Sequence, residues 1–292
     1  MNLPRIGVAA APLFLFAAFA SALPAHTWVS ASGSDANTGT AISPYADFAT
    51  AVANTAPGGI VSVMGPGDYG PLTITQSITI DGTGGGSIGF AGSGEAIYID
   101  VGANTNIVLR NLNIDGGGTG IDAIFIASAG TTNIVNVVID GCHLEGFAQI
   151  GVGLGSGSPT YVTVRNTTIQ GGTIGVRTFQ NGTAGPVTAY DHVLLDHVTI
   201  QGATTAGVFT RDGNVDISNS NIVQSLVGIQ ADSSATLSVE STMITSNTNG
   251  VCIYSGSTVV LRNTDLYDNG TAVESCGGTA EGAAGAGPSP KI

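Results

Sequence analysis

The sequence predicts an all-β chain that folds as a right-handed parallel β-helix solenoid of about eight coils, with a short capping helix at its N-terminal end. Three observations support this fold class. A phrase of alternating apolar and polar residues recurs along the chain, the last three intervals are 22 residues each, and β-branched residues recur at fixed offsets within the copies. A fixed period of 20–50 residues is typical of solenoids.

The copies align on one apolar residue that precedes a turn. These anchor residues are Ile80, Ile114, Leu144, Ile169, Ile200, Ile222, Ile244 and Leu266. Apolar residues also precede the anchor by five and seven positions, and a Gly-apolar pair follows it, so each copy predicts at least two short strands. Leucine-rich repeats would need Leu-rich positions, and left-handed hexapeptide helices would need a six-residue period. Neither pattern is present, which leaves a right-handed β-helix with coils about 4.8 Å apart.

Two columns of side chains support this register. Four positions before the anchor, charges of opposite sign alternate, as neighbouring strands prefer at facing positions. This column contains Arg110, Asp140, Arg165, Asp196, Ser218, Glu240 and Arg262. Three positions before the anchor an Asn recurs, which suits the left-handed backbone of a bend. These bend residues are Asn111, Asn166, Asn219 and Asn263. We expect their stacked amides to hydrogen-bond along the rod.

Residues 1–22 predict a signal peptide. Arg5 precedes a short apolar run, and Ala20-Ser21-Ala22 forms a small-residue cleavage site. The apolar run is shorter than the roughly 20 residues that a membrane span needs. We therefore expect a secreted protein, extracellular or periplasmic, with no membrane span in the mature chain.

The remaining chain predicts one domain and a tail. Residues 23–277 form the β-helix domain, and residues 23–59 form its N-terminal cap region. Within the cap, Ser43 and Pro44 predict the start of a helix with Phe48 and Val52 on one buried face. Residues 278–292 lack periodicity and predict a flexible tail.

Composition limits the partners. Charged residues make up 9 % of the chain, and the formal net charge is −13. Nucleic acid is an unsuitable partner because phosphate binding needs clustered Lys or Arg. A polyanionic polysaccharide would also be repelled unless a cation bridged it. Of the three cysteines, Cys252 and Cys276 are the plausible disulfide, and Cys142 falls at an apolar position that predicts a buried thiol.

The N-terminal part of the domain resembles a known family. "TWVSASGSDANTGTAISPYADFATAVA" and "PGGIVSVMGPGDYGPLTITQSITIDG", from Thr27 to Gly82, closely resemble the first segment of secreted right-handed β-helix proteins of the pectin-lyase-like superfold. The resemblance implies that this segment is a cap plus the first coil. Members include polysaccharide lyases, glycoside hydrolases, epimerases and adhesins, so the resemblance implies a fold and leaves the function open.

One column of polar residues follows the anchors directly. It contains Asp81, Asp115, Glu145, Gln170 and Gln201. Three carboxylates stacked about 4.8 Å apart could bind calcium or supply the two carboxyls of a glycosidase, and the glutamines could hydrogen-bond sugar hydroxyls. The alternative is that acids merely favour the turn before a glycine.

A second candidate group follows the insertion at residues 178–190. Phe179 and Tyr190 flank this insertion, and Asp191 and His192 come directly after it. Aromatic rings beside polar side chains predict a platform for sugar binding. The alternative is a structural role within the repeat.

Two hypotheses for the function follow. In the first, a polar face of the solenoid engages extracellular polysaccharide without catalysis, in a surface or adhesin-like protein. In the second, the protein degrades polysaccharide, as a glycoside hydrolase using Asp81, Asp115 or Glu145. A lyase is less favoured because Arg110, Arg165 and Arg262 belong to the charged column and the one Lys lies in the tail.

Overall fold

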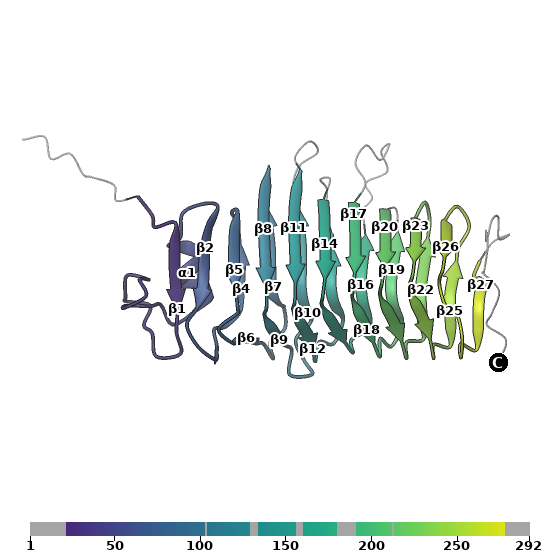
Figure 1. Ribbon diagram of the computed structural model, residues 1–292, viewed down its shortest axis with the longest axis horizontal. Helices are drawn as coiled ribbons and strands as arrows, with labels where there is room; N and C mark the ends of the chain where they lie inside the picture. Colours follow the sequence, from purple (N-terminus) through teal and green to yellow (C-terminus); the bar gives the residue numbers. More distant parts are fainter. Residues whose placement is uncertain are drawn as a thin grey trace, which may run out of the picture.

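Three parallel sheets run along the chain and enclose one elongated apolar core (Figure 1). The computed structural model describes residues 22–102, 104–128, 134–155, 160–179, 191–211 and 213–277. The predicted tail and all but the last residue of the predicted signal peptide lie outside the described residues. Within the described part, no helix is long and apolar enough to cross a membrane.

The chain passes through the sheets in a fixed order, which we call sheet 1, sheet 2 and sheet 3. Sheet 1 contains β1 (His26–Val29), β2 (Gly59–Val63), β5 (Ile78–Asp81), β8 (Thr105–Arg110), β11 (Val135–Asp140), β14 (Thr160–Arg165), β17 (Asp191–Asp196), β20 (Gly213–Ser218), β23 (Thr236–Glu240) and β26 (Thr258–Arg262). Sheet 2 contains β3 (Gly67–Asp68), β6 (Gly86–Gly89), β9 (Asn113–Asp115), β12 (His143–Glu145), β15 (Thr168–Gln170), β18 (Thr199–Gln201), β21 (Asn221–Val223) and β24 (Met243–Thr245). Sheet 3 contains β4 (Leu72–Ile74), β7 (Glu95–Val101), β10 (Asp122–Ser128), β13 (Ile150–Leu154), β16 (Ile174–Phe179), β19 (Ala206–Arg211), β22 (Val227–Asp232), β25 (Asn249–Ile253) and β27 (Thr271–Ser275).

Eight coils pass through all three sheets, from β2–β3–β4 to β23–β24–β25, and β26 and β27 belong to a final partial coil. The strands of adjacent coils pair in parallel. The period-2 alternation buries one column of aliphatic side chains per sheet, because alternate residues of a strand face the core. In sheet 2 this column contains Ile88, Ile114, Leu144, Ile169, Ile200, Ile222 and Ile244, all at most 1 % exposed. The predicted fold class is therefore confirmed.

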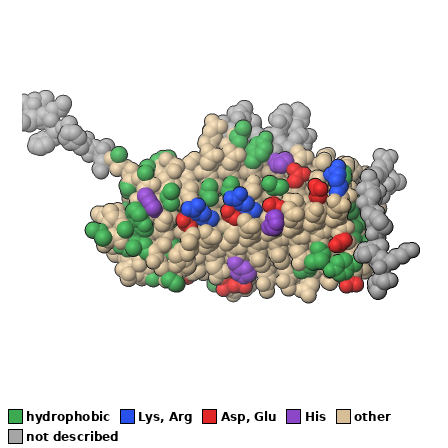
Figure 2. Space-filling view, viewed as in Figure 1, with side chains coloured by type: hydrophobic (Ala, Val, Ile, Leu, Met, Phe, Trp, Pro, Cys, Tyr) green, Lys and Arg blue, Asp and Glu red, His purple; other side chains and the backbone are tan. Residues whose placement is uncertain are grey.

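The charged column lies along sheet 1, as predicted. The guanidinium of Arg165 is 2.8 Å from the carboxylate of Asp140, and Arg165 also faces Asp196 on the following coil. Arg110 is 2.8 Å from Asp81 and faces Asp140 on its other side. The ladder of alternating charges thus extends one coil further towards the N-terminus than the sequence predicted. Figure 2 shows acidic and basic side chains in a band along this side of the rod.

The bend between sheets 1 and 2 places a non-glycine residue in the left-handed region in six coils. These residues are Asn111, Asn166, His197, Asn219, Ser241 and Asn263, with φ between 47° and 55°. The expected bonds between stacked amides are replaced by bonds to the ladder: Asn166 Nδ2 donates to Asp140 Oδ1 at 2.9 Å, and Asn219 Nδ2 donates to Asp196 Oδ1 at 2.8 Å. These bonds hold the pKa of Asp140 low and, with one from Ser218, lower the pKa of Asp196 to about 2.

The register predicted for the first coil is wrong. Ile80 lies in β5 of sheet 1, where it faces Leu109. Ile88 of β6 takes the place beside Ile114 in the sheet 2 column. The phrases around Ile80 and Ile114 therefore lie on different sheets, although both end in Ile-Asp-Gly.

The capping helix α1 (Phe48–Ala53) is shorter than predicted. It begins after Asp47, whose Oδ1 accepts a hydrogen bond from the Thr50 amide at 2.6 Å, so Ser43 is not the N-cap. Phe48 and Val52 are buried on one face, as expected. The cap region also contributes β1, which pairs with β2 and begins sheet 1.

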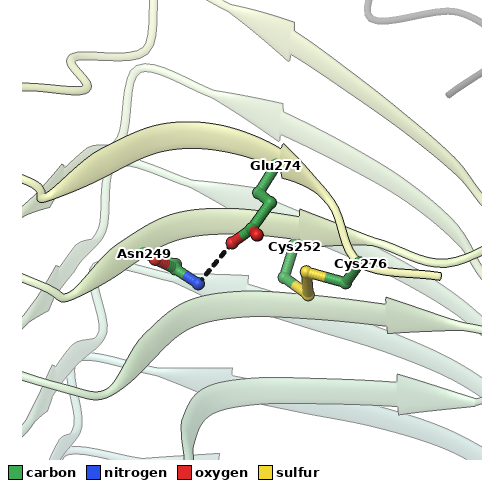
Figure 3. The surroundings of a disulfide bond; sticks show 4 residues. All are labelled: Asn249, Cys252, Glu274 and Cys276. Atoms are coloured by element: carbon green, nitrogen blue, oxygen red, sulfur yellow. Dashed lines mark hydrogen bonds between the residues drawn. A yellow bond between two sulfur atoms is a disulfide. The ribbon is translucent and has the colours of Figure 1, made fainter.

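A disulfide joins the final partial coil to the coil before it (Figure 3). Cys252 lies in β25 and Cys276 directly follows β27, which confirms the predicted pair. Asn249 Nδ2 donates a hydrogen bond to Glu274 between the same two strands. Cys142 is a free, buried cysteine, also as predicted, and burial raises the pKa of its thiol to about 11.

We predict measurable coupling within the charged ladder. The double-mutant cycle of Asp140→Ala and Arg165→Ala should give a coupling free energy of unfolding of about 0.5–1 kcal/mol, because the two side chains are half-exposed neighbours. In 1 M NaCl this value should fall towards zero. Urea unfolding measures both values. The distant pair Asp140 and Arg262 is the control and should show no coupling; equal coupling in both cycles would contradict the ladder.

We also predict that the disulfide stabilises the C-terminal end. The Cys252→Ser/Cys276→Ser variant should lose up to about 3 kcal/mol of unfolding free energy, because the bond closes a loop of 24 residues. Urea unfolding of the variant and of the reduced wild-type chain should agree. Unfolding curves that do not change on reduction would contradict this role.

Candidate functional site

The polar column that follows the anchors is partly assembled on sheet 2. Asp115 faces Glu145, Glu145 faces Gln170, and Gln170 faces Gln201. Asp81 does not belong to this column, because β5 lies in sheet 1 and Asp81 is ion-paired with Arg110 there. The expected stack of three carboxylates is therefore wrong.

The remaining carboxylates of this column have local partners. Asp115 Oδ1 accepts a hydrogen bond from the Gly117 amide at 2.8 Å, and Glu145 Oε2 is 3.3 Å from His143 Nε2. Within the described part of the chain, no three acidic, His or Cys side chains gather as a metal would require. A calcium site built from Asp81, Asp115 and Glu145 does not fit this geometry.

The second predicted group lies partly outside the described residues. Tyr190 lies outside the described residues, as does the side chain of Phe179, whose backbone belongs to β16. Asp191 is fully buried at the start of β17. His192 lies on the outer face of sheet 1, where its Nε2 is 3.2 Å from Asp216 and its ring contacts Tyr161. Of the two residues whose side chains the structure describes, Asp191 is buried and His192 is on the outer face, so these two do not share a surface.

The outer face of sheet 3 brings together a set of side chains that the sequence analysis did not connect. One outward column contains Tyr98, Phe125, Gly153, Arg177, Phe209 and Gln230 on successive coils. Apart from Gly153, every residue of this column is partly exposed. The residue that precedes each of them in its strand is buried. Three aromatic rings and an arginine therefore lie along one line of the rod.

The rings of this column have defined geometry. Tyr98 and Phe125 stack with centroids 6.1 Å apart and planes 2° from parallel. The ring of Phe125 lies over Gly153 and Gly155, where an added Cβ would come within 2.9 Å and 2.6 Å of it. The two glycines thus leave room for the Phe125 ring, which any larger residue at these positions would displace.

Arginine side chains extend this aromatic column towards the C-terminus. The guanidinium of Arg211 lies 5.9 Å from the Phe209 centroid, within the range of a cation–π contact. It also binds Asp232 through two nitrogens, at 2.6 Å and 3.1 Å. Arg177 faces Phe209 on the neighbouring coil. Neither arginine was predicted to be a site residue from the sequence.

A buried carboxylate begins the strand that carries Phe125. Asp122 is 4 % exposed, accepts a hydrogen bond from the Ile150 amide at 3.0 Å, and faces Glu95 on the preceding coil. Burial is the main reason that the pKa of Asp122 rises to about 6; Arg177 opposes this shift and the charge of Glu95 adds to it. Such a carboxyl changes charge near neutral pH, which is the range where general acids and bases work.

A recognisable signal for this face exists in the sequence. Each aromatic residue stands between two apolar or small residues that face the core, as in Ile97-Tyr98-Ile99, Ile124-Phe125-Ile126 and Val208-Phe209-Thr210. This pattern marks an aromatic residue at an outward position of a solvent-facing sheet. It also occurs in sheet 1, at Thr160-Tyr161-Val162, so it finds outward aromatic residues but does not by itself place them in one column.

Comparison with known proteins agrees with the architecture. The family model described as "Right handed beta helix region" matches residues 187–281, a segment that includes β17 to β27. The crystal structure of pectate lyase Pel9A is similar, with a TM-score of 0.55 and 13 % identity over 88 % of this chain and 81 % of that chain. Tailspike protein 3 of bacteriophage CBA120 aligns with a TM-score of 0.29 and 13 % identity over 76 % of this chain and 55 % of that chain.

The comparisons define a fold class and no activity. The chain is a right-handed parallel β-helix, the fold that pectate lyase Pel9A also has. At 13 % identity the likeness to that lyase concerns the fold alone. No curated protein matches the chain.

We predict a pH effect at Asp122. Its folded pKa of about 6 lies above the unfolded value of about 3.9, so the folded state binds the extra proton between these values. This contribution to stability is complete below about pH 4 and is lost as the pH rises through 6. Asp122→Asn, which cannot ionise, should therefore gain about 2 kcal/mol relative to wild type between pH 4 and pH 7. Urea unfolding at both pH values measures this difference, and an equal effect of the substitution at both would contradict the shift.

Proposed function

We propose that the protein binds a polysaccharide along the outer face of sheet 3, without catalysis. The observation that carries this proposal is the parallel, stacked pair of Tyr98 and Phe125, which lies on the outer face of sheet 3 in the same column as Phe209. A regular rod that repeats about every 4.8 Å suits a regular polymer as ligand. No single deep cavity is needed for such binding.

The chemistry of the face supports a sugar ligand. Pyranose rings present both C–H faces and hydroxyl groups, and aromatic rings beside hydrogen-bonding side chains match both. Arg177 and Gln230 flank Phe209 in the column and supply those polar groups. The mixture of apolar and polar side chains is typical of ligand sites rather than of a plain solvated sheet.

Charge favours a neutral polysaccharide. The chain has 20 acidic and 7 basic residues, so its overall field repels an anionic polymer. On this face, Arg211 is neutralised by Asp232, and Glu95 and Asp122 add acidic groups at the start of the strands that carry Tyr98 and Phe125. The predicted signal peptide and the disulfide accord with a secreted protein that meets such a polymer outside the cytoplasm.

The alternative function is a polysaccharide hydrolase. Asp122 and Glu95 face each other on adjacent coils, and the raised pKa of Asp122 suits a general acid. Asp115 and Glu145 form a second carboxylate pair on sheet 2. Of these pairs, Glu95 and Asp122 are the better candidates because they begin the strands that carry Tyr98 and Phe125.

We predict that binding depends on the aromatic column. Phe125→Ala and Phe209→Ala should each weaken binding to a neutral polysaccharide by about tenfold, because a sugar ring stacked on an aromatic side chain contributes on the order of 1 kcal/mol. Affinity electrophoresis through a series of neutral polysaccharides measures the change. Tyr161→Ala, an exposed aromatic residue on sheet 1, is the matched control and should bind as wild type does.

The same polysaccharides separate binding from turnover. Reducing ends released over a day of incubation should equal the blank for the wild type. A rise that Asp122→Asn abolishes would replace the binding proposal with the hydrolase. The role of sheet 3 would be contradicted if a polysaccharide slowed the migration of Phe125→Ala and Phe209→Ala in affinity electrophoresis as much as that of wild type.

A further inference from the structure

A groove follows the bend between sheets 1 and 2, across β18, β21 and β24. Its volume is about 580 Å³, within the range of about 300–1,000 Å³ that is typical of small-molecule sites. The bend residues His197, Asn219, Ser241 and Asn263 line one side of it. The groove shares no residue with the outer face of sheet 3.

Regular repetition builds the groove. Its four bend residues are 22 positions apart in the sequence and all have left-handed φ values, from 47° to 54°. Because the coils here are equal in length, the same bend recurs on each coil, and the successive bends form one side of a continuous groove. With coils about 4.8 Å apart, three intervals give a length of roughly 14 Å.

One polar atom of the groove is buried without a partner. Asn221 Oδ1 accepts no hydrogen bond from any described residue. The neighbouring amide of Asn219 points elsewhere, since its Nδ2 donates to Asp196. A buried acceptor without a partner is unfavourable, so the site loses stability unless a ligand or water donates to it. Asn221 itself lines the groove, so a turn of its amide towards the groove would let a ligand hydroxyl satisfy this oxygen.

The other groups of the lining identify the class of ligand. Among the residues that line it in the described part of the chain, none is Lys or Arg, and the ionisable ones are His197 and Asp265. Met243 adds an apolar surface on the strand that follows Asn221, next to Tyr267, whose hydroxyl lies 2.9 Å from its sulfur. A phosphate or sulfate would find no cation here.

A metal ion is also a poor match. Calcium requires several carboxylate or carbonyl oxygens. No three acidic, His or Cys side chains gather anywhere in the described residues. Amide and hydroxyl groups with one carboxylate and one thioether favour a neutral ligand that carries many hydroxyls.

We propose that this groove is a saccharide-binding site for a short segment of a neutral glycan, with Asn221 Oδ1 accepting a hydrogen bond from a sugar hydroxyl. The site is separate from the face assigned under the proposed function and does not depend on it. A protein with both sites would hold two glycan segments on different sides of one rod.

The test compares three variants on an array of neutral and anionic glycans. Asn221→Ala removes the buried acceptor, and Phe125→Ala alters the face of sheet 3. Asn113→Ala is the matched control, because Asn113 occupies the same column of sheet 2 on a coil outside the groove. A set of neutral glycans should bind wild type, Asn113→Ala and Phe125→Ala equally and Asn221→Ala about tenfold more weakly.

Thermal unfolding gives the second readout. The Tm of Asn221→Ala should equal or exceed that of wild type, because the substitution removes an unsatisfied acceptor; a weakened glycan signal then reports the lost contact rather than unfolding. The proposal is overturned if Asn221→Ala retains every glycan signal. Loss of all signals in Phe125→Ala alone would also overturn it while supporting the sheet 3 site, and an array without any signal would overturn both.

Discussion

In-register hydrogen bonding between parallel coils is the constraint on which the rest of the structure depends. Each strand pairs with the equivalent strand one coil before and one coil after it, so a residue has a fixed neighbour on either side along the rod. Inward positions then become unbroken aliphatic columns. Outward positions become columns in which side chains of neighbouring coils interact directly. In one such column the positive charge of Arg165 lies between the negative charges of Asp140 and Asp196.

The bends allow this register to continue. A left-handed residue between sheets 1 and 2 turns the chain within one position, and Asn, Ser or His holds that conformation in six coils. Their side chains also contribute bonds, since Asn166 and Asn219 donate to carboxylates of the ladder. The bend residues thus turn the chain, hydrogen-bond to the carboxylates of the charged ladder and line the groove.

Much of this fold could be predicted from the sequence, because columns at fixed offsets repeat over seven copies. The ladder, the bend residues, the disulfide and the sheet 2 pairs Asp115–Glu145 and Gln170–Gln201 were all placed correctly. The first coil was misplaced because a strand that ends in Ile-Asp-Gly occurs both in sheet 1 at Ile80 and in sheet 2 at Ile114. Periodicity alone does not distinguish two sheets whose strands end in the same letters.

The candidate site was harder to predict because it lies beyond a turn of variable length. Phe125 comes 11 residues after its anchor Ile114, whereas Phe209 comes 9 residues after Ile200. An alignment on the anchors therefore scatters the aromatic column, and only the pairing of sheet 3 brings it into line. The predicted stack of three carboxylates was wrong because the sequence alignment placed Asp81 in sheet 2, whereas it lies in sheet 1 and pairs with Arg110.

The two outer surfaces now have distinct chemistry. Sheet 1 carries a neutralised charge ladder, and sheet 3 carries aromatic rings with a buried carboxyl at one end. Neither arrangement is visible in any single repeat, since each depends on side chains from at least three coils. The register is therefore the central claim, and it supports every assignment made to these surfaces.

Disulfide trapping tests that register most directly. Thr163 and Leu194 face each other on the outer side of adjacent coils, at a spacing of about 4.8 Å, which a disulfide can span. Thr163→Cys/Leu194→Cys should therefore oxidise readily to an intramolecular crosslink identified by mass spectrometry. Thr163→Cys/Asp216→Cys places the thiols two coils apart, roughly 10 Å, and should not. Efficient crosslinking of the second pair, or none of the first, would contradict the account.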